Sequence, residues 1–138
     1  MSVTDFLGKR IVVIGAGISG RAAAAVLKRH GGTVVLNDIK EHDENAEPWR
    51  TLRARGITCI FGRLDSSVLD GADIVVPSPV ISPEIPIMRE AVKRNLPVWS
   101  EVEVACRVTD ADFIGITGTN GKTTTTTLAG EIMKASGR

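Results

Sequence analysis

The chain has 138 residues, enough for one ordinary domain with its own core. Hydrophobic residues make up 43% and charged residues 24%, a balance typical of a globular protein, and no run approaches membrane-spanning length. A formal net charge of +1 gives no reason to expect nucleic acid or a membrane surface as a partner, and the two cysteines form neither a metal motif nor a disulfide scaffold. Because residues 1–10 also lack an apolar signal-peptide core, we expect a cytoplasmic protein. We also expect it to be a monomer.

Strand-like apolar runs alternate with helix-forming segments along the chain. Five strands are predicted, at residues 11–14, 34–36, 57–61, 72–76 and 97–99. Helices are predicted at residues 19–30, 48–55 and 84–94, with a brief helix at 101–107. This alternation predicts a doubly wound, Rossmann-like α/β fold whose five-stranded parallel sheet is covered on both faces.

A domain boundary is predicted near residues 108–112, so that residues 1–108 form a first domain and residues 109–138 begin a second one. The second part starts with a strand at 112–117, passes through a glycine-rich loop and ends in a helix to about residue 136. One strand and one helix cannot bury their own apolar faces. We therefore expect residues 112–138 to be mobile, or ordered only by packing on another part.

The first glycine-rich loop, Gly15-Ala16-Gly17-Ile18-Ser19-Gly20, fits the GxGxxG pattern between the first strand and the first helix. Asp38 follows the second strand at about the distance expected for an acid that holds a ribose. Any nucleotide diphosphate, NAD included, could approach the helix N-terminus here, and a tight turn without a ligand is the alternative. Ser19 would contact a phosphate or cap the helix. His42 lies among charged residues and is expected to face water.

The second loop, Gly118-Thr119-Asn120-Gly121-Lys122-Thr123-Thr124, predicts a cradle for a nucleoside triphosphate. Its backbone N–H groups and the Lys122 ammonium would face the phosphates, and the Thr123 hydroxyl would bind the accompanying magnesium. The spacing is shortened, because Ile116 stands where the common pattern has a glycine. A purely structural turn would explain the glycines but not the Lys-Thr pair at the helix start.

The shortened loop resembles the ATP loop of the Mur ligases and of their folylpolyglutamate synthase relatives. The first glycine loop, Ser78-Pro79 and Glu101-Val102-Glu103 extend the resemblance to Mur ligases over essentially the whole chain. Asn120 favours the branch that adds D-glutamate, because the ligase adding L-alanine typically has histidine at this position.

The resemblance implies an ATP- and Mg²⁺-dependent ligase of bacterial peptidoglycan synthesis. Its substrates would be UDP-N-acetylmuramoyl-L-alanine and D-glutamate: phosphorylation turns the first into an acyl phosphate, which the amine of the second attacks. By resemblance the UDP-sugar residues are Gly15, Gly17, Ile18, Ser19, Asp38, Ile39 and Lys40. The ATP residues are Gly118, Thr119, Asn120, Gly121, Lys122, Thr123 and Thr124, with Lys122 catalytic and Thr123 on the metal.

One residue departs from the family pattern: Val80 stands where Mur ligases of this type have glycine after the Ser-Pro pair. A side chain there would either crowd the sugar end of the substrate or reshape the turn. The resemblance places the remaining metal ligands, a modified lysine and the closing domain after Arg138, so we expect residues 1–138 alone to be inactive. An NAD-binding oxidoreductase and a regulatory nucleotide-binding module are the alternatives.

Overall fold

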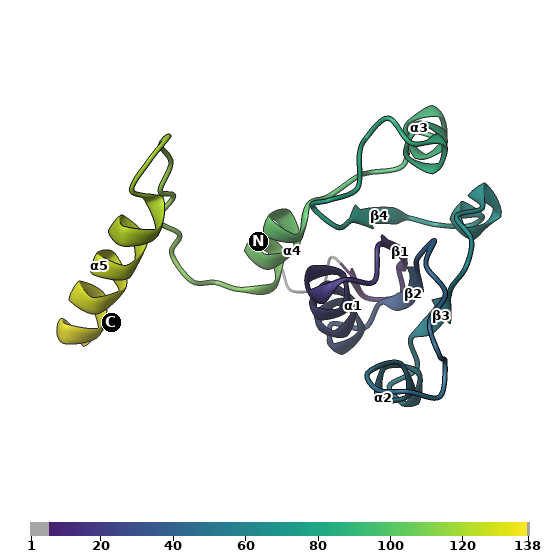
Figure 1. Cartoon of the computed structure of the whole chain (residues 1–138), viewed down its shortest axis with the longest axis horizontal. Coiled ribbons are helices and arrows are strands. Elements are labelled where there is room, and N and C mark those ends of the chain that lie inside the picture. The colour runs from purple at the N-terminus through teal and green to yellow at the C-terminus, as the bar shows by residue number, and fades with distance from the viewer. Residues whose placement is uncertain (1–5, 138) are drawn as a thin grey trace.

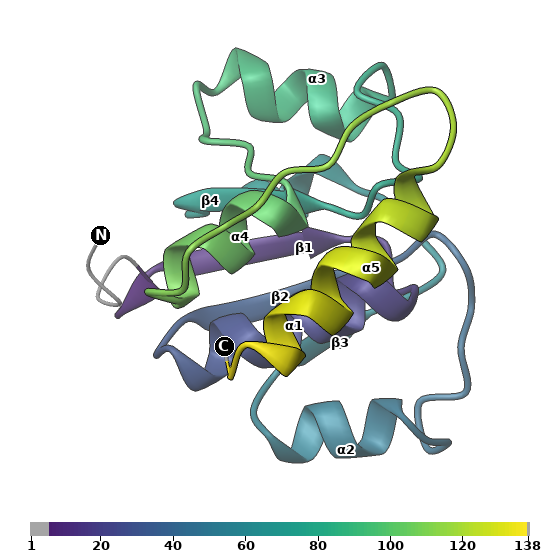
Figure 2. The same ribbon diagram turned by 90° about the vertical axis from the view of Figure 1, so that its left-hand side faces the viewer.

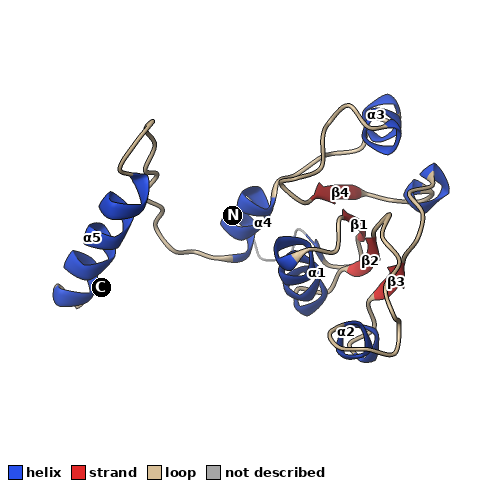
Figure 3. Cartoon of the chain, viewed as in Figure 1, coloured by secondary structure: helices blue, strands red, loops and turns tan. Residues whose placement is uncertain are grey.

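The structure is a computed structural model that describes residues 6–137. Its centre is a sheet of four parallel strands in the order β3-β2-β1-β4, with helices on both faces (Figure 1). The strands are β1 (Arg10–Ile14), β2 (Thr33–Asn37), β3 (Thr58–Ile60) and β4 (Ile74–Pro77). The helices are α1 (Ile18–Arg29), α2 (Trp49–Ala54), α3 (Pro86–Lys93), α4 (Glu101–Val108) and α5 (Lys122–Ala135), with a 3₁₀ turn, η2, at Ser66–Leu69. The predicted doubly wound α/β architecture is confirmed, as the helices and strands in Figure 3 show.

The central strand β1 explains why its sequence is an unbroken apolar run. Ile11 and Val13 point to one face and pack with α1, α2 and α4, whereas Val12 and Ile14 point to the other face and pack with η2 and α3. All four side chains are fully buried. A parallel strand covered on both faces has no polar side, so alternation of polar and apolar residues is absent.

The sheet has four strands rather than the predicted five. Residues 97–99 form a single parallel bridge, Val98 to Val75, held by hydrogen bonds from Val75 N–H to the Pro97 carbonyl (2.9 Å) and from Trp99 N–H to the Val75 carbonyl (2.9 Å). Pro97 has no N–H to donate, and Ser100 already caps α4 by accepting from the Glu103 N–H. The segment is therefore too short to become a strand.

The strand predicted at residues 112–117 is also absent from the structure, which has no regular secondary structure between α4 and α5. Phe113 and Ile114 are 58% and 67% exposed. No neighbouring strand within residues 6–137 lies beside this segment, and an unpaired strand leaves its backbone hydrogen bonds unmade. The expected strand–loop–helix unit is thus present only as loop and helix.

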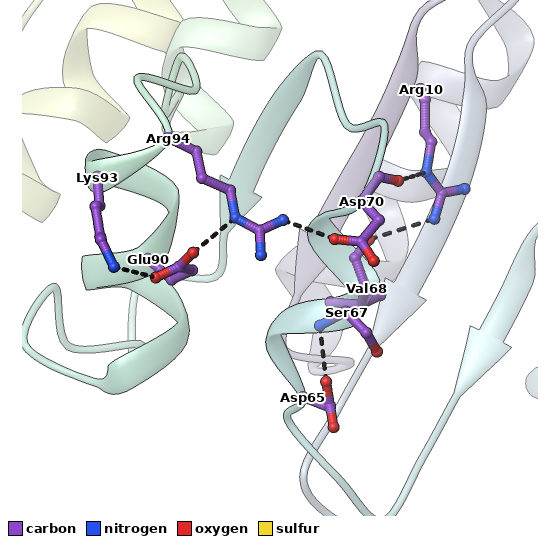
Figure 4. Close-up of polar contacts among 8 residues, drawn as sticks. All are labelled: Arg10, Asp65, Ser67, Val68, Asp70, Glu90, Lys93 and Arg94. Carbon is purple, nitrogen blue, oxygen red and sulfur yellow. Dashed lines mark hydrogen bonds and ion pairs between the residues drawn. The ribbon is translucent and has the colours of Figure 1, made fainter.

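Surface hydrogen bonds and ion pairs join β1 to η2, and η2 to α3 (Figure 4). Arg10, at the start of β1, donates through Nε to the carbonyl of Asp70 (3.0 Å) and through Nη2 to that of Val68 (3.3 Å). Arg94, just after α3, bridges Asp70 and Glu90 at 2.8 Å each. The hydrogen bond from Arg94 lowers the pKa of Glu90, so this contact stabilises the fold at neutral pH and is lost as the pH falls through that lowered pKa. Such exposed ion pairs contribute little to the free energy of unfolding.

Helix α5 stands apart from the compact part of the chain in Figure 1, and Figure 2 shows it lying across the side that carries α1 and α4. It has no buried residue, and Leu128 and Ile132 are 59% and 67% exposed. Its first half is a run of threonines with modest helix propensity, of which Thr126 and Thr127 bond back to carbonyls one turn earlier. Little tertiary packing therefore stabilises this helix.

We predict that α5 opens readily in solution. A short helix without tertiary packing is marginal in water. The amides of residues 123–133 should therefore exchange with an opening free energy of about 0 kcal/mol. The amides of β1, which is buried on both faces, should exchange only through global unfolding, with an opening free energy of about 5 kcal/mol or more. Amide hydrogen exchange of a dilute monomer measures both segments at once. Protection across residues 123–133 equal to that of β1 would show that the helix is stably packed.

Candidate functional site

The first glycine loop connects β1 to α1 at the carboxyl edge of the sheet. Gly15 has φ = +96°, a conformation that favours glycine, and its N–H donates to the Asn37 carbonyl at 2.8 Å. Gly20 lies directly against this turn, since a Cβ on Gly20 would be 1.9 Å from the Gly15 carbonyl oxygen. Gly17 differs from both: a Cβ there would have no heavy atom within 4 Å. The loop is therefore packed tightly on the protein side and open above Gly17.

The N-terminus of α1 is open to a ligand at the same point. Gly17 is the N-cap residue, and no side chain caps the helix by a hydrogen bond. Ser19 lies inside the first turn, so the prediction that it caps the helix is wrong. Ile18 is 82% exposed beside it, and the first turn has no acidic residue. Uncapped N–H groups and the positive end of the helix dipole together favour an anion here.

The predicted acidic residue, Asp38, lies beside this loop at the end of β2. Its Oδ2 accepts a hydrogen bond from the Ala16 N–H at 2.6 Å, and its Oδ1 accepts one from the Lys40 N–H at 2.9 Å. The neighbouring Ile39 is 63% exposed, and Lys40 is exposed as well. The fold thus brings the seven residues expected to contact a UDP-sugar to one edge of the sheet, where open α/β folds bind ligands.

The turn after β4 completes this edge. Ser78 is buried and donates its N–H to the Ile14 carbonyl at 2.8 Å, and the Ile81 N–H closes the turn on the Ser78 carbonyl at 2.9 Å. Val80 is 88% exposed. Within residues 6–137, Asn95 is the only non-glycine residue with a positive φ, so the turn holds Val80 without a conformation that would require glycine. The side chain of Val80 projects into solvent and does not pack against the protein.

The second glycine-rich loop precedes α5. Gly118 and Gly121 both have positive φ, of +154° and +77°, and Gly121 is the N-cap of the helix. Lys122 folds back so that its ammonium donates to the Gly118 carbonyl, while Thr123 and Thr124 lie in the first turn. This arrangement fits a phosphate cradle, because a left-handed glycine, a helix N-terminus and a fixed ammonium meet in one turn.

His42, a neighbour of the first site, was predicted to face water, and this prediction is wrong. Its ring does not face water but packs against Trp49 and Phe61, with ring centroids 4.4 and 4.7 Å away. Its Nε2 lies 3.8 Å from Oδ2 of Asp38. The surrounding run of charged residues gave no sign of this, because the aromatic partners come from later in the chain.

Neither a metal cluster nor a membrane helix is present in the part of the chain that the structure describes. No group of three or more His, Cys, Asp or Glu side chains within residues 6–137 is placed to hold a metal ion. No helix of these residues is both long and apolar enough to cross a bilayer. The expected metal contact of Thr123 stays a prediction.

Comparisons with known proteins identify the family of the chain. Residues 9–100, which contain β1 to β4 and the first glycine loop, match the model of the Mur ligase MurD-like N-terminal domain. The chain belongs to the MurD-like Mur ligases. The similarity to known proteins extends beyond residues 9–100. The UDP-N-acetylmuramoylalanine–D-glutamate ligases from Exiguobacterium sibiricum, Bacillus velezensis and Bacillus subtilis are 42%, 47% and 44% identical to the chain, over 97%, 94% and 98% of its length.

The chain spans only part of these relatives, 29% of the first two and 30% of the third. Solved Mur-type ligases show the same relation. A pseudomurein peptide ligase type C from Methanothermus fervidus matches 94% of the chain and 27% of its own, with 29% identity and a TM-score of 0.64. The murein peptide ligase mpl from Psychrobacter arcticus matches the same shares, with 25% identity and a TM-score of 0.66.

Proposed function

We propose that the chain is the amino-terminal part of an ATP-dependent ligase that adds D-glutamate to UDP-N-acetylmuramoyl-L-alanine through an acyl phosphate, in peptidoglycan synthesis. The observation that carries the proposal is the 42–47% identity to ligases of that name, which extends over both glycine-rich loops. We propose residues 1–108 as the UDP-sugar domain and residues 109–138 as the start of the ATP-binding domain. Two free cysteines, Cys59 and Cys106, agree with a cytoplasmic location.

The first loop would bind the UDP part of the substrate. The open space above Gly17 lets a diphosphate reach the uncapped N–H groups of α1, with Ile18 and Ser19 beside it. Asp38, Ile39 and Lys40 would lie along the uridine. Val80 would lie toward the sugar, and its exposed side chain would contact the part of the substrate beyond the diphosphate.

The second loop would bind ATP with Mg²⁺, which supply the phosphoryl group and part of the charge neutralisation. Gly118 to Thr124 fit these ligands, because the backbone turn and the Lys122 ammonium already face one another. Lys122 would exchange its bond to the Gly118 carbonyl for a phosphate oxygen and hold charge at the transferring group. Thr123, in the first turn of α5, would direct its hydroxyl to the metal.

Ligand titration of the chain tests the first-domain assignment. We expect UDP-N-acetylmuramoyl-L-alanine to bind more tightly than NAD, in calorimetry or by amide chemical shifts. Gly17→Val should remove the UDP-sugar binding, because its side chain would fill the space above the helix N-terminus. The domain should stay folded, since Gly17 has φ = −66° and open surroundings. Tighter binding of NAD, or unchanged UDP-sugar affinity in folded Gly17→Val, would contradict the assignment.

A further inference from the structure

His42 belongs to a packed aromatic cluster beside the first glycine loop. Its ring contacts Trp49 and Phe61, and those two rings contact each other with centroids 4.9 Å apart. Trp49 is 7% exposed and part of the core, so the cluster is anchored to the domain. The His42 side chain is 22% exposed, and its position is therefore set by the two rings.

One nitrogen of this ring is buried without a hydrogen bond. Among residues 6–137, the Nε2 atom of His42 has no hydrogen-bond partner, although its surface is inaccessible to water. Buried polar atoms are rarely left so, because desolvation without a partner costs free energy. The acceptor that it faces is Oδ2 of Asp38, at 3.8 Å, so a small tightening of the loop would give Nε2–H its partner.

Asp38 transmits this contact to the glycine loop. The Oδ2 atom that faces His42 is the same atom that accepts the Ala16 N–H, at 2.6 Å. The other oxygen is held by the Lys40 N–H. A continuous series of contacts therefore runs from the aromatic cluster through His42 and Asp38 to the backbone between Gly15 and Gly17.

We propose that His42 is a positioning residue for the first glycine loop, acting as the third donor that fixes the Asp38 carboxylate on the Ala16 N–H. The inference rests on the proposed function, because the ligand of this loop is the UDP part of the substrate. With Asp38 fixed, the loop keeps the space above Gly17 open and the N–H groups of α1 directed at the diphosphate. Without the His42 donor, the carboxylate keeps only the two backbone donors that the structure shows, from Ala16 and Lys40, and the loop is less well ordered for binding.

Two substitutions of His42 separate its donor from its packing. His42→Leu keeps apolar volume beside Trp49 but removes the donor, and His42→Gln restores an N–H close to the place of Nε2. With UDP as the probe, His42→Leu should bind about tenfold more weakly, the usual value of one hydrogen bond to a charged group. His42→Gln should bind within about twofold of the unchanged chain, since its donor is retained. In ¹⁵N spectra, the Ala16 amide should move upfield and exchange faster in His42→Leu only.

Phe61→Leu is the matched control, because it disturbs the same cluster without touching the donor. It should lower the unfolding temperature while leaving the Ala16 amide and the UDP affinity unchanged. Unchanged Ala16 and UDP affinity in His42→Leu, equal losses in His42→Gln, or the same losses in Phe61→Leu would each overturn the role of His42. Absence of UDP binding by the unchanged chain would instead contradict the proposed function, and the Ala16 amide would still test the His42–Asp38 contact.

Discussion

Replacing Gly20 with alanine is expected to destabilise the domain by about 3 kcal/mol or more, at the upper end of what an overpacked site costs. The added methyl group would lie 1.9 Å from the Gly15 carbonyl oxygen and 3.1 Å from its carbon. Neither atom can move freely, because the Gly15 N–H is bonded to the Asn37 carbonyl and α1 packs on the sheet through Ala24 and Leu27. The helix must therefore shift away from β1, and its core contacts are lost.

Urea unfolding followed by circular dichroism measures this effect, and Gly17→Ala is the matched control. Gly17 lies in the same loop, but a Cβ there meets nothing within 4 Å, so its cost should stay within about 1 kcal/mol, the difference between glycine and alanine as N-cap. Equal midpoints for Gly20→Ala and Gly17→Ala would show that α1 does not pack on Gly15 as closely as the structure has it.

Periodicity and turn residues were sufficient to predict β1 to β4 and the helices, because each of these elements has a strong local signal. The run from Ile11 to Ile14 is suited to a strand buried on both faces, and Gly31-Gly32 ends the helix before β2. The errors concern strands with weak or missing neighbours. Residues 97–99 are limited by Pro97 and the Ser100 cap of α4, both of which are visible in the sequence. Residues 112–117 lack a partner within the described chain, which a single-segment pattern cannot reveal.

The two loops of the candidate site could also be predicted from the sequence, but their contacts could not. The glycine spacing located both loops, since the backbone of a phosphate loop restricts its own sequence. The contacts that organise the first loop could not be found in this way. Asp38 and His42 lie in the one connection that follows β2, but the Ala16 N–H that Asp38 holds follows β1, and Phe61, which packs on His42, follows β3. Only the parallel order of the strands brings them to one edge.

Lys122→Ala in the full-length ligase is expected to abolish measurable phosphoryl transfer, with a loss of about 100- to 1,000-fold or more. Removing one preorganised group from the transferring charge typically costs about 3–4 kcal/mol of transition-state stabilisation. The loop gives this lysine a defined place, because its ammonium already lies over the turn and bonds to the Gly118 carbonyl. Lys122→Arg should restore little activity, since a planar guanidinium does not fit a turn that holds a compact ammonium.

Lys134→Ala provides the control on the same helix. Lys134 lies in the last turn of α5 and pairs with Glu131 at 2.8 Å on an exposed surface, so its removal changes the net charge by the same amount far from the loop. It should keep near-normal turnover, because an exposed pair contributes little to stability and Lys134 lies at the opposite end of α5 from the loop. Formation of ADP on mixing ATP, UDP-N-acetylmuramoyl-L-alanine and D-glutamate measures both variants. If Lys122→Ala formed ADP as fast as Lys134→Ala, the ammonium at the Gly118 turn would have no part in the reaction, and the loop would bind ATP through its backbone alone.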